Sequence, residues 1–212
     1  EDAQHSGAKP SARWGHSATI LDDLVLFVGG AESFQGGLAE AWLFSEVSGW
    51  NIAPTTNTPI LSAHTANYVG NHLYCFGGDG RDESIDTWDL DISSMNWSVL
   101  KVSGTPPRWR RTAASATVSG SIYIFGGWGS GGPLNDCHTL KVASADGQWN
   151  QLEFAIRERT PPQRGSHTAT TIGDAGHEII VVYGGFNGNQ LGDIWVLDTR
   201  LPSPTWYEPL PA

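Results

Sequence analysis

Four apolar runs in this chain of 212 residues each end in a pair of glycines. The first glycines of the pairs, Gly29, Gly77, Gly126 and Gly184, are 48, 49 and 58 residues apart, so the pattern extends over most of the sequence. Self-similarity at a period near 50 indicates an architecture assembled from similar structural units. The second glycines of the pairs are Gly30, Gly78, Gly127 and Gly185.

Aromatic residues keep a nearly constant distance from these glycine pairs. An aromatic or imidazole ring follows each second glycine by ten to twelve residues, at Trp42, Trp88, His138 and Trp195. A tryptophan follows it by nineteen to twenty-two residues, at Trp50, Trp97, Trp149 and Trp206. His16 and His64 precede the first glycine by thirteen residues, Ala113 stands there in the third unit, and His167 fits the fourth unit if residues 173–178 contain a four-residue insertion.

The residue pattern of each unit predicts four short strands. In the first unit they are residues 16–21, 24–28 and 41–46, followed by a strand that carries Trp50. The second strand of each unit is continuously apolar, which predicts burial on both faces. Its glycine pair would allow a positive φ and the close approach of a ring, for which the later tryptophan of the same unit is the candidate. No stretch has the pattern of a long amphipathic helix, so we expect an all-β fold.

This order of features resembles the kelch repeat of β-propellers. In that repeat a strand ends in Gly-Gly, a ring follows about ten residues later, and a second tryptophan follows about ten residues after the ring. The resemblance covers about residues 10–210 and implies one four-stranded blade per repeat. We therefore expect a single kelch β-propeller region over residues 1–212, with repeats at about 8–54, 55–103, 104–156 and 160–212. Kelch propellers usually have more than four blades, so we expect another chain or a further segment to complete the ring. A closed ring of four blades is the alternative.

Charge and cysteine content limit the classes of partner and compartment. The formal net charge of −10 argues against nucleic acid or an anionic membrane as the main partner. Residues 1–104 hold 13 acidic and 4 basic side chains, a net of −9, whereas residues 105–212 hold 9 and 8, a net of −1. The apolar runs are too short to span a bilayer. The only cysteines, Cys75 and Cys137, form no disulfide framework or metal-binding spacing, which favours a cytoplasmic or nuclear location.

The sequence contains no convincing catalytic or metal-binding motif. The glycine-rich stretch at 127–132 follows a strand and opens no helix, so it is not a phosphate loop. A copper site of the kelch-like sugar oxidases needs converging Tyr, Cys and His, but Tyr74 and Cys75 occupy repeat positions. The iron-binding string of kelch-like specifier proteins needs a His. The acidic stretch that contains Glu83 and Asp86 has no His, so this pattern is absent. We predict no catalytic residue, metal or cofactor; a kelch-type enzyme or metal-dependent factor is the alternative.

The resemblance implies that partners bind two sets of loops, one after the glycine pairs and one leading into the first strands. These loops hold aromatic and arginine residues, which are enriched at binding hot spots. Arg13, Arg110 and Arg164 each lie three residues before the repeat histidine position, where a structural role is the alternative, so Arg108 and Arg111 are the freer candidates. The candidate partner-binding residues are Trp14, Phe34, Arg81, Arg108, Trp109, Arg110, Arg111, Trp128, Phe186 and Asn187.

These observations predict a non-catalytic module that binds a protein partner. Guanidinium groups pair bidentately with carboxylates, so an acidic peptide is the expected ligand of the segment 109–111. A solvated rim without a binding role is the alternative for this segment. Kelch proteins include substrate receptors of ubiquitin ligases and scaffolds, and the sequence favours neither role. A purely architectural subunit of a larger complex is a further alternative.

Overall fold

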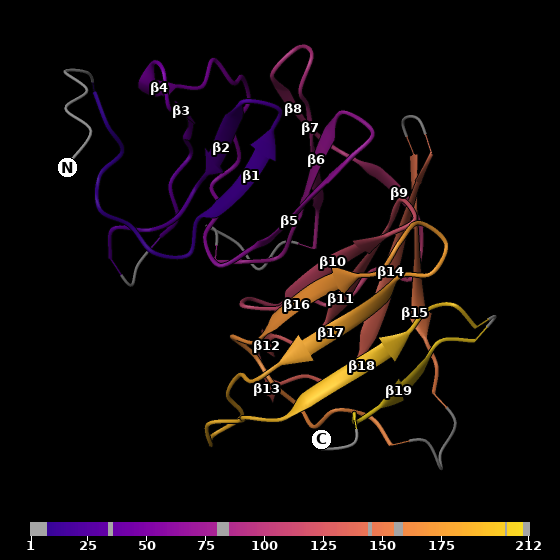
Figure 1. The fold of residues 1–212 in the computed structure, drawn as a ribbon. Coiled ribbons are helices and arrows are strands. Elements are labelled where there is room, and N and C mark those ends of the chain that lie inside the picture. Colours follow the sequence, from indigo (N-terminus) through magenta and orange to yellow (C-terminus); the bar gives the residue numbers. More distant parts are fainter. Residues whose placement is uncertain are drawn as a thin grey trace. The chain divides into compact units, whose positions relative to one another are not determined.

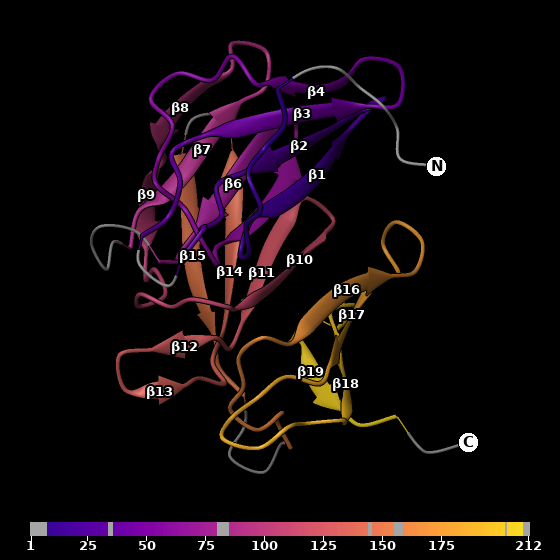
Figure 2. The same cartoon turned by 90° about the vertical axis from the view of Figure 1, so that its left-hand side faces the viewer.

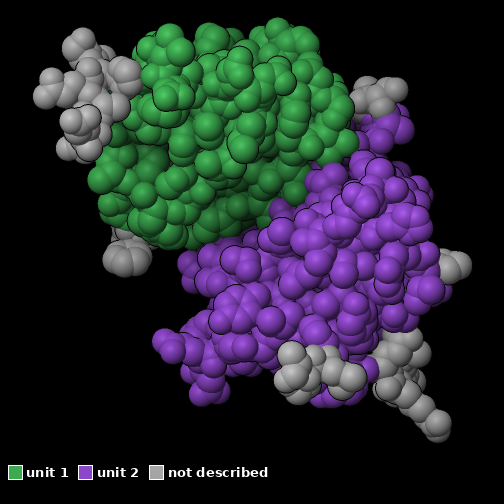
Figure 3. Space-filling model, in the orientation of Figure 1, with its two compact units in different colours: residues 1–99 green, residues 100–212 purple. Residues whose placement is uncertain are grey.

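The computed structural model describes residues 8–33, 36–79, 85–143, 146–154, 159–201 and 203–209. Every regular element in these ranges is a β-strand, so the predicted all-β fold is confirmed. The chain divides into two compact units, residues 1–99 and residues 100–212, which Figure 3 shows in different colours.

The first unit consists of two antiparallel sheets of four strands, each paired in chain order (Figure 1). Blade 1 contains β1 (Ser17–Leu21), β2 (Leu24–Val28), β3 (Ala41–Ser45) and β4 (Gly49–Ile52). Blade 2 contains β5 (Thr65–Val69), β6 (His72–Phe76), β7 (Thr87–Asp91) and β8 (Asn96–Val99). The strands of blade 1 agree with the predicted ones to within a residue at each predicted end.

The second unit contains two further sheets and a short hairpin. Blade 3 consists of β10 (Ala114–Val118), β11 (Ser121–Phe125), β14 (Cys137–Ala143) and β15 (Asp146–Leu152). A fifth strand, β9 (Lys101–Gly104), pairs in parallel with β15, although its residues fall at the end of the second predicted repeat. The hairpin of β12 (Trp128–Gly129) and β13 (Gly132–Pro133) lies at the end of blade 3, beyond β11 (Figure 2).

Blade 4 is again a four-stranded antiparallel sheet. It contains β16 (Thr168–Ile172), β17 (Ile179–Tyr183), β18 (Ile194–Asp198) and β19 (Thr205–Tyr207). The turn between its first two strands spans residues 173–178, whereas the corresponding turns of the other blades have two residues. The predicted four-residue insertion is therefore confirmed, and His167 holds the same position before its first strand as His16 and His64.

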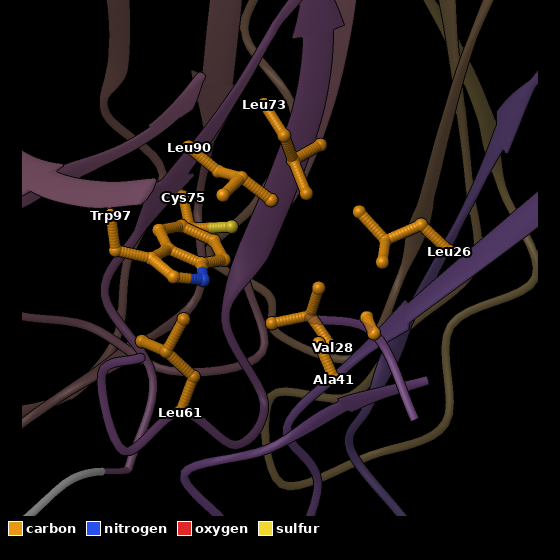
Figure 4. Close-up of a cluster of buried hydrophobic side chains, with 9 residues drawn as sticks. Leu26, Val28, Ala41, Leu61, Leu73, Cys75, Leu90 and Trp97 are labelled. Atoms are coloured by element: carbon orange, nitrogen blue, oxygen red, sulfur yellow. The ribbon is translucent and has the colours of Figure 1, made fainter. Parts of the chain in front are cut away.

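In each unit the two blades pack face to face and enclose a hydrophobic core. Alternate residues of a strand point to opposite faces, so one face of each blade contributes to this core. In the first unit Leu26 and Val28 of blade 1 pack with Leu73, Cys75 and Trp97 of blade 2 (Figure 4). In the second unit the corresponding core contains Phe125 and Cys137 of blade 3 and Val182, Trp195 and Trp206 of blade 4.

All eight glycines of the four pairs have a positive φ, between 62° and 102°, as predicted. Their nearest neighbours differ from the prediction, because loops rather than the later tryptophans lie against them. A Cβ atom on Gly29 would be 2.2 Å from the carbonyl oxygen of Leu61, and one on Gly126 would be 2.6 Å from that of Arg164. The amides of Gly30 and Gly127 donate to the same two carbonyls at 2.8 Å. The glycine pair therefore binds one blade to the entry loop of the next.

The second strands are not all buried on both faces, contrary to the prediction. Tyr183 at the end of β17 and Leu24 at the start of β2 are exposed. Tyr183 points to the face of blade 4 that is turned away from blade 3, and no sheet of the second unit packs on that face. A second strand needs a neighbour on each side of its blade to be buried completely.

We predict that Gly29→Ala destabilises the protein by about 3 kcal/mol or more, because the new Cβ would meet a backbone carbonyl that cannot move freely. Gly70→Ala is the matched control, since Gly70 has a similar φ of 57° but no atom within 4 Å of the added Cβ. That change should cost about 1 kcal/mol. Urea unfolding followed by tryptophan fluorescence measures both, and equal losses would contradict the close contact.

Candidate functional site

The two predicted loop sets lie side by side at one end of each blade. We call the predicted residues 13–15, 61–63, 109–111 and 164–166, together with Arg108 and Thr112, the lead-in loops, and the residues directly after each glycine pair the post-glycine loops. Isolated β-bridges join Trp14 to Ala31, Arg111 to Trp128, and Gly165 to Phe186. In blade 2 the amide of Asp79 donates to the carbonyl of Ser62 at 2.6 Å. One lead-in and one post-glycine loop thus form a common edge in every blade.

A buried arginine connects these loops in blades 3 and 4. Arg164 in blade 4 donates from Nη1 and Nη2 to the two carboxylate oxygens of Asp193, both at 2.8 Å. Its Nη1 also donates to the carbonyl of Gly184 at 2.8 Å, and its Nε to that of Pro162 at 3.1 Å. The side chain is 0% exposed. This arrangement, which we call the arginine clamp, ties the lead-in loop to the glycine pair and to the start of the third strand.

Blade 3 contains the same clamp, made by Arg110. Its guanidinium forms two hydrogen bonds with Asp136, at 2.6 and 2.8 Å, and donates to the carbonyls of Gly126 and Arg108. Arg110 was predicted as a partner-binding residue, but its side chain is only 1% exposed. The buried ion pair uses its hydrogen-bonding groups, so we leave Arg110 out of the candidate surface.

Blades 1 and 2 differ at this position. Arg13 in blade 1 pairs with Glu40 and donates to the carbonyl of Gly29 at 3.1 Å, which repeats the clamp with a longer acid. In blade 2 the position is taken by Leu61, which is buried in the core of the first unit. The sequence shows the arginine register, but the acidic partners before the third strands were not identified from it.

The clamps shift the pKa of their carboxylates. The hydrogen bond from Arg164 lowers the pKa of Asp193, and the indole N–H of Trp195, at 2.7 Å from Oδ2, lowers it further. Burial raises the pKa of Asp136, but hydrogen bonds from Arg110 and His138 outweigh burial and hold that pKa well below its usual value. Both acids are therefore charged at neutral pH, as an ion pair with arginine requires.

The candidate residues that remain accessible in the second unit gather around two aromatic rings. Trp128 and Phe186 stack with their centroids 6.2 Å apart and their planes 26° from parallel. Phe186 is exposed and Trp128 is half-buried. Arg111 is exposed and is the bridge partner of Trp128, while Arg108 is exposed at the start of the same lead-in segment. We call Arg108, Arg111, Trp128 and Phe186 the aromatic–arginine surface.

Gly165 positions the indole of this surface. A Cβ atom on Gly165 would lie 2.1 Å from Cδ1 of Trp128, so the ring rests directly on the glycine backbone. The lead-in loops of the other blades have Trp14, Ser62 and Arg111 at the corresponding place. The absence of a side chain in blade 4 therefore allows the indole of blade 3 to cross onto blade 4 and meet Phe186. Sequence reasoning did not identify this glycine, because it belongs to no glycine pair.

The other candidate residues are placed differently. Trp109 is half-buried, and Asn187 is half-buried in a turn where its Oδ1 accepts a hydrogen bond from the amide of Asn189 at 3.2 Å. Trp14 is exposed in the first unit. Phe34 and Arg81 lie outside the described residues. The structure thus brings together Arg111, Trp128 and Phe186 but does not assign Trp14 to the same surface.

One residue of each lead-in loop adopts the left-handed conformation. Its φ is 67° at Gly15, 54° at Ala63, 50° at Thr112 and 54° at Ser166. Only the first of these is a glycine, so the sequence contains no signal for this turn. The conformation is strained for the other three, and for the β-branched Thr112 most of all. Their carbonyls or amides join adjacent lead-in loops, as in the bond of 2.9 Å from the amide of Ser166 to the carbonyl of Thr112.

Comparison with known proteins agrees with this geometry. The family model described as KLHDC2/KLHL20/DRC7 Kelch-repeats domain matches residues 15–211. The chain belongs to the kelch-repeat family. The resemblance predicted from the glycine pairs and tryptophans is therefore confirmed, and the four sheets are kelch-type blades.

Several curated proteins are similar to this kelch chain. Human host cell factor 1 is 29% identical over 227 residues, which cover 96% of the chain and 11% of that protein. Human Kelch domain-containing protein 3 is 28% identical over 202 residues, covering 88% of the chain and 51% of that protein. An F-box/kelch-repeat protein of Arabidopsis thaliana is 35% identical over 160 residues, covering 69% and 32%. The chain thus spans about a tenth of the first relative and half of the second.

The described part of the kelch chain offers little for metal or thiol chemistry. No group of three or more His, Cys, Asp or Glu residues within it could hold a metal ion. Burial raises the pKa of the Cys75 and Cys137 thiols well above its usual value, so neither forms a reactive thiolate at neutral pH. No helix in the described ranges is long and apolar enough to cross a membrane.

The repeat histidine of blade 4 is buried and that of blade 2 is half-buried, and both are uncharged at neutral pH. Burial and the neighbouring His16 lower the pKa of His64 to about 4. Burial and Arg164 lower the pKa of His167 to about 4 as well. His64 Nε2 lies 3.0 Å from the hydroxyl of Ser17, and the ring of His167 packs edge-on against Phe125. These contacts indicate a blade-packing role for both rings.

We predict that Arg164→Ala lowers the free energy of unfolding by about 3 kcal/mol, because it leaves the Asp193 carboxylate and the Gly184 carbonyl without their buried partner. Arg200→Ala is the control in the same blade, since Arg200 is exposed where it pairs with Asp198 and should contribute little to stability. Thermal and urea unfolding measure both variants. Similar losses would contradict a special role for the clamp.

We also predict that the free energy of unfolding depends on pH because of His64. Unfolded histidine binds a proton below about pH 6.5, whereas folded His64 does so only near pH 4, so stability falls as the pH drops through this window. His64→Gln should reduce the slope of unfolding free energy against pH by up to about 1.4 kcal/mol per pH unit. Urea unfolding at a series of pH values between these limits measures the slope, and a slope equal to that of the wild type would refute the assignment.

Proposed function

We propose that this kelch chain is a non-catalytic protein-binding module that recognises an acidic segment of its partner through the aromatic–arginine surface. The observation that carries the proposal is the division among the arginines of the lead-in loops. Arg110 and Arg164 are buried in clamps, whereas Arg108 and Arg111 are exposed outside the clamp register. Guanidinium groups in that position can form bidentate pairs with carboxylates.

The aromatic pair adds an apolar contact beside the two charges. Aromatic rings and arginines on a rigid support are the side chains that contribute most to protein interfaces. The backbone bridges of Arg111 to Trp128 and of Gly165 to Phe186 hold the surface on two packed blades, so little conformational entropy is lost on binding. The relatives support a protein-interaction module in general terms, and the acidic character of the ligand rests on the two exposed arginines.

An architectural role is the second candidate, and the exposed sheet faces of blades 1 and 4 favour it. Large apolar side chains such as Ile20 and Tyr183 are exposed on these faces. Further sheet packed there, from another chain or from a longer polypeptide, would extend the series of blades. This role is compatible with a working loop surface, since the faces and the loops are different parts of each blade.

We predict that Arg108→Glu/Arg111→Glu weakens binding of an acidic partner by at least about tenfold, because two attractive charges become repulsive. Lys101→Glu/Lys141→Glu is the control, with the same change of net charge at exposed residues elsewhere in blade 3. Fluorescence anisotropy with a labelled polyglutamate peptide measures affinity, and crosslinking from the native source identifies the partner. Equal binding by both double variants would show that the loop surface does not recognise acid.

A further inference from the structure

The post-glycine loop of blade 4 contains an asparagine that is directly followed by a glycine. Asn187 and Gly188 form the only such dipeptide in the sequence. They lie in a turn between Phe186 and Gln190, which form an isolated antiparallel bridge. The backbone amide after an asparagine can attack the side-chain carboxamide, and glycine has no Cβ to hinder that approach. This dipeptide is therefore a candidate for spontaneous covalent change.

The amide of Gly188 is accessible to the neighbouring side chain. Gly188 is exposed, its φ is 112°, and a Cβ atom on it would have no atom within 4 Å. Its amide donates no hydrogen bond to any residue that the structure describes. A nitrogen that is neither shielded nor hydrogen-bonded needs no local unfolding before it reacts.

The carboxamide of Asn187 is held in the turn by a hydrogen bond to its oxygen. The amide of Asn189 donates to Oδ1 of Asn187 at 3.2 Å, and the amide of Asn187 donates to the carbonyl of Asn189 at 3.2 Å. The first bond folds the side chain toward the backbone of the residue between them. Attack on the side-chain carbon places negative charge on Oδ1, where an N–H donor stabilises it as in an oxyanion hole. The turn therefore positions and activates the carboxamide.

We propose that Asn187 is a site of spontaneous deamidation that weakens acid binding by the aromatic–arginine surface, so this inference rests on the proposed function. The nitrogen of Gly188 loses its proton to hydroxide and forms a bond to Cγ of Asn187. The bond from Cγ to the side-chain nitrogen breaks, and that nitrogen takes a proton from water and leaves as ammonia. Water then adds to either carbonyl of the resulting succinimide ring and breaks its C–N bond. The products are aspartate and isoaspartate, the latter with the chain continued through the side-chain carbonyl.

Both products change the surface at Phe186. Each has a carboxylate where Asn187 had a neutral side chain, directly beside the exposed phenyl ring in the sequence. Isoaspartate also lengthens the backbone inside the turn that the bridge between Phe186 and Gln190 closes. A carboxylate repels an acidic ligand, and a displaced ring no longer offers the same contact. Conversion of Asn187 should therefore weaken the binding of acid.

Mass spectrometry of the folded protein tests the chemical step. The purified chain is incubated at neutral and at alkaline pH, and fragment spectra locate the mass gain of an acid over an amide. We expect the gain at Asn187, with aspartate and isoaspartate both present and with faster conversion at the higher pH. Asn189 is the matched control within the same turn, since it is exposed but is followed by Gln190. An unchanged Asn187, or an equal gain at Asn189, overturns the proposal.

Binding of the labelled polyglutamate peptide tests the consequence. Converted protein should bind at least about threefold more weakly than fresh protein, with a smaller difference at high salt. Asn187→Gln, incubated in the same way, should keep its affinity because its longer side chain closes a ring less readily. Equal affinities of fresh and converted protein, or the same loss in incubated Asn187→Gln, overturn the regulatory role.

Failure of the proposed function would give a different result. In that case fresh wild type and Arg108→Glu/Arg111→Glu would bind the peptide equally. The mass gain at Asn187 is measured without any ligand, so it decides the chemical step whether or not the surface recognises acid.

Discussion

The contact between each glycine pair and the loops around it is the constraint on which the rest of the structure depends. The amides of Gly30 and Gly127 reach the lead-in carbonyl of the next blade only because no Cβ atom stands between them. This contact fixes one blade against its neighbour and draws two loops to a common edge. A rigid sheet with ordered loops at one end is the usual support for a binding surface. The glycine repeat is thus a requirement of packing first and of function second.

The arginine clamp of blade 3 shows how differently neighbouring residues of one type can be placed. Arg110 is buried against Asp136, while Arg108 and Arg111 on either side of it are exposed. A buried guanidinium needs a charged partner and filled hydrogen bonds, which Asp136 and two backbone carbonyls provide for Arg110. Blade 2 dispenses with the clamp and uses Leu61 in the hydrophobic core instead. The loop edge therefore tolerates either a polar or an apolar support.

Blade packing and the proposed partner binding use different parts of the sheets. Faces pack against faces, as in the cores that contain Trp97 and Trp206, while loops at one end carry the aromatic–arginine surface. The open faces of blades 1 and 4 therefore need not compete with the loop surface for a partner.

The sequence by itself determined the repeat, the four-stranded blades, the positive φ of the glycine pairs and the extra turn before β17, because all of these follow from local spacing and backbone sterics. Only the tertiary structure decided which arginines are buried, since Asp136 and Asp193 lie far from their partners in sequence. It also decided what packs against the glycines and where the indole of Trp128 rests. Such contacts join segments of different strands and blades, and local spacing contains no information about them.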